Sequence, residues 1–190
     1  TLNVNNINEA GGVDAVITAG VLDSGSLPAG SILQVVSTTK TDTFSASLAQ
    51  GASTAVTGLS ATITPTSTAS RILINVSIGQ IGTSNGFGDY GVKVYDGSNF
   101  IGVGDAAGSR QRVNTGAVAT SSGSANYVNA SVAFTVEDSP ATTSSKTYSV
   151  YVSHGSGVTH TQYVNRSPGD SDASNWHRSS STITLMEIAG

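Results

Sequence analysis

The residues with the clearest chemical potential lie in one long polar loop near the end of the chain. Asp170, Asp172 and Ser174 have the spacing of the first ligands of a calcium-binding loop. The glycine and the bidentate glutamate that such a loop needs at its sixth and twelfth positions are replaced by Asn175 and Ser181. The two carboxylates are therefore candidates either for a non-standard calcium site or for turns that order the loop.

The same loop holds the only tryptophan, Trp176. An aromatic ring stacks on the face of a sugar while neighbouring carboxylates, imidazoles and guanidinium groups bind its hydroxyls, so the loop is a candidate sugar-binding surface. The alternative is that Trp176 is an amphipathic plug that fastens the loop to the protein body or to a neighbouring chain. A glycine-rich segment that ends at Tyr90 is a second candidate surface, although Tyr90 equally fits the first residue of a strand. The candidate receptor contacts are Trp176, His177, Arg178, Asp170, Asp172, Phe87 and Tyr90.

Three patterns that would indicate catalysis, a cofactor or a metal are incomplete. The Gly102-x-Gly104-x-x-x-Gly108 run departs from the spacing of a dinucleotide-binding loop, and no helix is predicted after it. Ser171, with His177 nearby, is similar to the nucleophile block of certain esterases, but no oxyanion hole is recognisable. His154 and His160 could meet across a hairpin, yet a third zinc ligand is missing. We therefore predict a non-enzymatic protein with no cofactor and no assigned metal ligand, while calcium binding by Asp170 and Asp172 stays open.

The composition narrows the class of protein. Only 11% of the 190 residues are charged, well below the roughly 25% of ordinary soluble domains. The absence of cysteine excludes disulfides and thiolate metal sites. The net charge of −4 and the scattered basic residues argue against a nucleic-acid partner. No run approaches the ~20 apolar residues of a membrane span, so membrane insertion is not expected.

Alternation of apolar and polar residues, the signature of half-buried strands, recurs along the chain. It is clearest at 71–78, 127–136 and 147–152, and Asp96-Gly97 is the strongest hairpin signal. Further strands are expected at 32–38, 55–64, 90–95, 100–103, 113–119, 161–165 and 181–188. Eight to ten strands joined by short polar turns predict an all-β, antiparallel β-sandwich, in its most favoured form a jelly roll.

The first and last of these strands are apolar on both faces. In the last strand Ile183 and Leu185 point one way, and Met186 and Ile188 point the other. The first strand, from Ile32 to Val36, shows the same property. Because such strands need cover on both sides, we predict that one side meets another copy of the chain. The candidate interface residues are Ile32, Leu33, Val35, Val36, Ile183, Leu185, Met186 and Ile188.

Three runs carry a family resemblance: Asp138-Ser-Pro-Ala-Thr-Thr-Ser, Gly102-Val-Gly-Asp-Ala-Ala-Gly-Ser-Arg and Ser181-Thr-Ile-Thr-Leu-Met-Glu-Ile. With them the chain resembles the C-terminal head domain of tail-fibre and other appendage proteins of bacterial viruses. Residues 3–22 are similar to the short stalk repeats that precede such heads, although the order Gly12-Val-Asp-Ala-Val departs from the Gly-Val-Thr-Ile-Asp-Gly-Val of the repeats.

The resemblance implies a homotrimeric virion component with a stalk at residues 1–29 and a jelly-roll head at 30–190. Its expected partners are its sister copies, other virion proteins through the N-terminal segment, and a glycan on the host surface. Since the chain begins at Thr1, we expect it to be a piece of a longer protein. Two alternatives stay open: a capsid decoration or head-fibre protein that binds no receptor, and a monomeric carbohydrate-binding module that uses Trp176.

Overall fold

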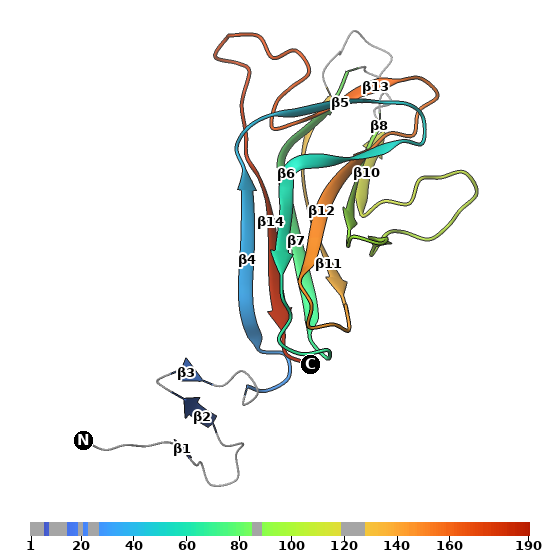
Figure 1. The fold of residues 1–190 in the computed structure, drawn as a ribbon. Coiled ribbons are helices and arrows are strands. Elements are labelled where there is room, and N and C mark those ends of the chain that lie inside the picture. The colour runs from blue at the N-terminus through green and yellow to red at the C-terminus, as the bar shows by residue number, and fades with distance from the viewer. Residues whose placement is uncertain (1–5, 8–14, 19–20, 23–26, 85–88, 119–127) are drawn as a thin grey trace.

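Two antiparallel β-sheets face each other across an apolar core, and the described residues contain no helix (Figure 1). The structure is a computed structural model that describes residues 6–7, 15–18, 21–22, 27–84, 89–118 and 128–190. The predicted all-β, antiparallel sandwich is confirmed. None of the described elements is a helix long and apolar enough to cross a bilayer.

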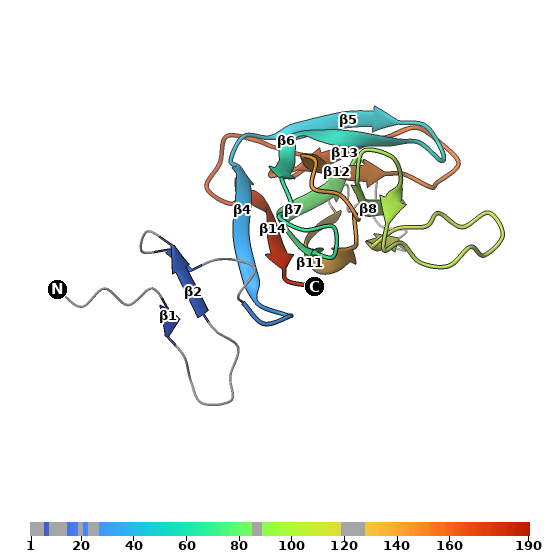
Figure 2. The same ribbon diagram turned by 60° about the horizontal axis from the view of Figure 1, so that its bottom comes forward.

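The first sheet is built around β7, the longest strand. Its order is β4-β14-β7-β13-β5, with β11 on the other edge of β7. Figure 2 shows β5 and β13 side by side, as their pairing requires. The strands of this sheet are β4 (Ile32–Lys40), β5 (Phe44–Leu48), β7 (Arg71–Thr83), β11 (Val128–Asp138), β13 (His160–Val164) and β14 (Ser181–Ile188).

The second sheet has the order β10-β8-β12-β6, with the short β9 also on β8. Its strands are β6 (Ser53–Ile63), β8 (Asp89–Tyr95), β9 (Phe100–Ile101), β10 (Thr115–Val118) and β12 (Lys146–Ser153). A separate small sheet precedes the sandwich and consists of β1 (Asn6–Ile7), β2 (Ala15–Thr18) and β3 (Val21–Leu22). The boundary between stalk and head at residues 29 and 30 stays a prediction.

The core follows the alternation of the sequence. Each inward side chain of β7, β12 and β14 is buried, while its neighbours along the strand face outward. Burying an aliphatic side chain of this kind contributes about 1.5–3 kcal/mol. The fully buried inward residues of these strands are Ile72, Ile74, Val76, Ile78, Tyr148, Val150, Val152, Ile183 and Leu185.

The chain enters and leaves the sandwich at the same end, which we call the foot. The amide of Gly30 donates to the carbonyl of Ala189 (2.8 Å), and the amide of Ala189 donates to the carbonyl of Ser31 (2.8 Å). β4 runs upward from this point beside β14 (Figure 1). The opposite end, where β8 begins and β12 ends, is called the far end below.

The turn after β8 is the predicted hairpin. Asp96 accepts hydrogen bonds from the amides of Ser98 and Asn99, and Gly97 has a φ of 94°, a conformation that glycine adopts without strain. β9 ends earlier than expected because Gly102 turns with a φ of 61°. A Cβ at Gly102 would lie 2.8 Å from the Val136 side chain, so a glycine at this position lets the two strands approach closely.

Candidate functional site

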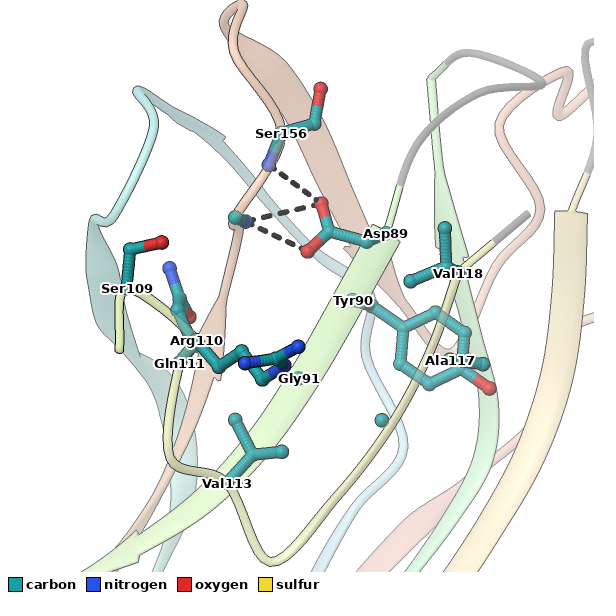
Figure 3. A pocket seen from close by; sticks show the side chains of 12 residues that line it. Asp89, Tyr90, Gly91, Ser109, Arg110, Gln111, Val113, Ala117, Val118 and Ser156 are labelled. Carbon is teal, nitrogen blue, oxygen red and sulfur yellow. Dashed lines mark hydrogen bonds between the residues drawn. The ribbon is translucent and has the colours of Figure 1, made fainter. Parts of the chain in front are cut away.

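A pocket of about 690 Å³ lies at the far end, between the start of β8, the segment 109–118 and the turn after β12 (Figure 3). Its walls combine apolar, hydroxyl, amide and guanidinium groups. The lining residues that matter below are Asp89, Tyr90, Ser109, Arg110, Gln111, Val113, Val118 and Ser156. This mixture of groups and this size are typical of sites for small ligands.

The carboxylate of Asp89 holds the turn that forms one wall of the pocket. It accepts the amide of Gly155 at 2.8 and 3.1 Å and the amide of Ser156 at 3.1 Å, as the dashed lines in Figure 3 show. A Cβ at Gly155 would lie only 2.7 Å from this carboxylate, so a larger residue there would displace the Asp89 side chain. Gln111 adds a hydrogen bond from its side-chain amide to the carbonyl of His154. The segment 109–113 is thereby tied to the same turn.

Behind Asp89 lies a buried histidine. His154 is 0% exposed; its Nδ1 lies 2.8 Å from Asp89 Oδ1 and its Nε2 lies 2.8 Å from the carbonyl oxygen of Val158. The Asp89 carboxylate and the Val158 carbonyl therefore hold the ring on its two sides. The Asp89 carboxylate is thus engaged by the histidine ring and by two backbone amides within the protein.

His160 packs edge-on against His154, with ring centroids 4.8 Å apart. The two histidines thus meet, as the sequence suggested, but each is enclosed in the body of the protein. In the part of the chain that the structure describes, no three His, Asp or Glu side chains gather as a metal site.

We expect the stability of the protein to fall as the pH drops below 6.5, the ordinary pKa of histidine. Burial, and then the charge of His154, hold the pKa of His160 below that value, while Asp89 acts in the opposite direction. Because the unfolded chain binds this proton more readily, stability is complete above pH 6.5 and is lost as the pH falls toward the lower, folded pKa. Denaturant unfolding at pH 7.5 and 5.5 measures the loss.

The matched control for this effect is the exposed His177. His160→Asn should remove part of the pH dependence, whereas His177→Asn should leave it unchanged. Equal pH dependence in the two variants would contradict the assignment to His160.

The long polar loop between β13 and β14 is organised by Asp170. Its carboxylate contacts Arg178 at 2.8 Å and Arg166 at 3.3 Å. Asn165, at the base of the loop, is buried and donates to the carbonyls of Lys40 and Asp42. The Asp170 carboxylate is thus engaged by two guanidinium groups, which favours the loop-ordering interpretation over the calcium interpretation.

The remaining candidates of the loop are distributed around it. Trp176 is partly buried, while Asp172 and Arg178 are exposed. His177 is exposed too and lines a small cavity of about 230 Å³ next to β7 and β11. The structure brings the side chains of Asp170 and Arg178 into contact. Among the described residues, no hydrogen bond or ion pair joins Asp172 to either of them.

Of the second candidate surface, Tyr90 lines the far-end pocket and is mostly buried. Phe87 lies outside the described residues. The sequence interpretation missed the pocket's other polar groups, because they come from three separate segments. The one local signal was the close pair of Arg110 and Arg112.

A second candidate site is an apolar area on the outer face of the first sheet, at the foot. Ile32 and Val35 of β4 are 55% and 57% exposed. β14 contributes Met186, opposite Val35, and Ile188, opposite Ile32, and β7 contributes Leu73, opposite Met186. Residues directly opposite each other in a sheet share a face. We call Ile32, Val35, Leu73, Met186 and Ile188 the outer foot patch.

The structure places four of the eight candidate interface residues away from this outer face. Ile183 and Leu185 are 0% exposed in the chain's own core, and Val36 packs against that core. Leu33 is partly buried at the irregularity of the β4–β14 pairing. That irregularity also moves Ile32 onto the same face as Val35, whereas strict alternation had put them on opposite faces. The interface candidates that remain on the outer face are Ile32, Val35, Met186 and Ile188.

Comparison with known proteins adds no further assignment: neither a protein-family model nor a curated protein matches this chain. The functional argument therefore depends on the pocket, the loop and the outer foot patch.

Proposed function

We propose that this chain is the stalked head of a non-enzymatic virion appendage protein, a homotrimer that presents a binding surface to host glycans. The observation that carries the proposal is the outer foot patch. An apolar area on an exposed sheet face marks a surface that another molecule covers. Because the patch adjoins Gly30, where the stalk segment enters, we assign it to sister copies of the chain.

The order of the strands supports a jelly roll. If β4, β6, β7, β8, β10, β11, β12 and β14 are counted one to eight, the two sheets follow the orders 1-8-3-6 and 2-7-4-5. This is the order in which two Greek keys wind into a jelly roll, a fold common in viral proteins. The chain's resemblance to phage appendage heads agrees with it, although fold alone does not determine function.

The rest of the outer face is polar. The ion pair between Arg71 and Glu137 (2.9 Å) lies beside the patch, opposite Ile188 and Leu73. Above the patch, hydroxyl and amide side chains pair across the strands: Ser37 with Thr184 (3.1 Å), Thr39 with Thr182 (3.1 Å) and Asn75 with Thr135 (3.0 Å). Such neutral pairs are not weakened by salt as exposed ion pairs are. We propose that sister chains make an apolar contact through the outer foot patch and a polar, more hydrated contact above it.

Attachment would then be multivalent. Three weak sites on one rigid trimer bind together with far higher avidity than one site alone. In this arrangement the N-terminal segment connects the head to other virion proteins and the far ends face the host, so the protein would act on the surface of the particle.

Light scattering on the purified chain tests the proposal. We expect a particle with the mass of three 19.0 kDa chains at micromolar concentration. A monomer across the accessible concentration range would reject the trimer and favour a monomeric binding module.

A further inference from the structure

We propose that the far-end pocket binds an acidic saccharide unit, a sugar ring that carries a carboxylate, and that Arg110 receives this carboxylate. The inference deepens the proposed attachment function and rests on it. It is carried by the charge of the pocket, the chemistry of its walls and the rigidity of its frame.

The charge of the pocket favours an anion. The oxygens of the Asp89 carboxylate already have partners, namely the His154 ring and the amides of Gly155 and Ser156. Arg110, in contrast, is exposed, and the one described hydrogen bond of its side chain runs from Nη1 to the carbonyl of Ala107 (3.2 Å). No ion pair between described residues involves it. A guanidinium has five N–H donors, so most of them are left to bind a carboxylate in the fork geometry that arginine prefers.

The walls of the pocket suit a sugar rather than a simple carboxylate. Figure 3 shows Arg110 between Gln111 and Gly91, with the Tyr90 ring on the far side next to Val118. Ser109 and Ser156 belong to the same lining. A sugar ring presents hydroxyls along its edge and an apolar C–H face, and this lining offers partners for both. The volume of about 690 Å³ accommodates one or two sugar units.

The frame of the pocket is held by partly buried hydrogen bonds, so little ordering is needed on binding. Asp89 locks one wall, as described above. Asn114 connects the other wall to the sheet, since its Oδ1 accepts the amide of Val94 (2.8 Å) and its Nδ2 donates to the carbonyl of Ile101 (2.9 Å). A site that is already ordered loses less entropy when it binds its ligand.

NMR titration of the whole chain with methyl glucuronide, and with methyl glucoside as the neutral analogue, tests the inference. We expect millimolar binding of the glucuronide, weaker at high salt, with shifts at Tyr90 and Val113, and no binding of the glucoside in the same range. Arg110→Gln should weaken binding by roughly tenfold or more, the effect of losing a charge-assisted hydrogen bond. Arg110→Lys keeps the positive charge but cannot form two parallel hydrogen bonds to a carboxylate. Its affinity for the glucuronide should therefore lie between those of the unchanged protein and the Arg110→Gln variant.

The control is Arg112→Gln, which removes the same charge from an exposed neighbouring arginine outside the pocket lining and should leave the affinity nearly unchanged. Equal binding of the neutral glucoside, an unaffected Arg110→Gln protein, or loss of binding in Arg112→Gln would each overturn the inference. No glucuronide binding by a chain that still forms trimers would reject the pocket assignment alone. Binding through Arg110 by a monomer would reject the trimer and keep the pocket.

Discussion

Replacing Glu187 with alanine is expected to lower the free energy of unfolding by about 3 kcal/mol or more. Glu187 is 0% exposed at the foot, and its carboxylate accepts hydrogen bonds from Gln34 (2.5 Å), the amide and hydroxyl of Thr66 (both 2.7 Å) and the hydroxyl of Ser70 (2.7 Å). Alanine would leave these donors buried without an acceptor. It would also release the turn between β6 and β7 from β14.

The conservative control is Glu187→Gln, which keeps the size of the side chain and one acceptor oxygen. The glutamine variant should lose less free energy of unfolding than the alanine variant. Urea unfolding at one fixed protein concentration measures both, because an assembling protein gains stability with concentration. A change below about 0.5 kcal/mol for the alanine variant, typical of a neutral surface substitution, would contradict the role of Glu187.

The same carboxylate makes the foot sensitive to acid. Burial would raise the pKa of Glu187, but the hydrogen bonds from Gln34, Ser70 and Thr66 outweigh it and hold the pKa below its ordinary value of 4.5. The contribution of Glu187 is therefore complete above pH 4.5 and is lost as the pH falls through the lower, folded pKa. The Glu187→Gln protein should lack this part of the acid-induced loss.

Val35→Asp is expected to convert the trimer into monomers without unfolding the head. Val35 is 57% exposed in the single chain, so the substitution should change the stability of an isolated chain by only about 0.5 kcal/mol. In the trimer it would bury three carboxylates among apolar side chains, at a cost of several kcal/mol. Light scattering reports the mass, and circular dichroism reports the retained β-structure.

Thr57→Asp is the matched control, since it adds the same charge at an exposed position of β6 in the other sheet. It should remain a trimer. If Val35→Asp also remained a trimer, or if both variants became monomers, the outer foot patch would not be the interface.

The long core strands could be predicted from the sequence because alternation is a local property. β7 and β12 each place a run of aliphatic or aromatic side chains at every second position, and these are the buried ones. β5 escaped prediction because Phe44-Ser-Ala-Ser-Leu48 has only small residues between its apolar ends. Alternation also predicted the wrong face for Ile32 at the foot. The irregularity in the β4–β14 pairing reverses the face of the residues beyond it.

The far-end pocket could not be predicted in the same way. Asp89 and His154 are 65 positions apart, and their pairing depends on the neighbouring positions of β8 and β12 in the sheet. Glu187 gave no signal either, because its polar partners come from β4 and from the turn between β6 and β7. By contrast, the contact of Asp170 with Arg178 lies within one loop, and the sequence had grouped these two residues.

The entry of the chain at the foot, beside β14, has a mechanical consequence. A particle held by its stalk and by a ligand at the far end would pull β4 lengthwise against β14. Backbone hydrogen bonds of antiparallel strands lie across the strand direction, so the whole ladder from Ile32 to Lys40 would carry this tension in shear, with its bonds loaded together. Such a joint resists detachment far better than one that peels open a bond at a time.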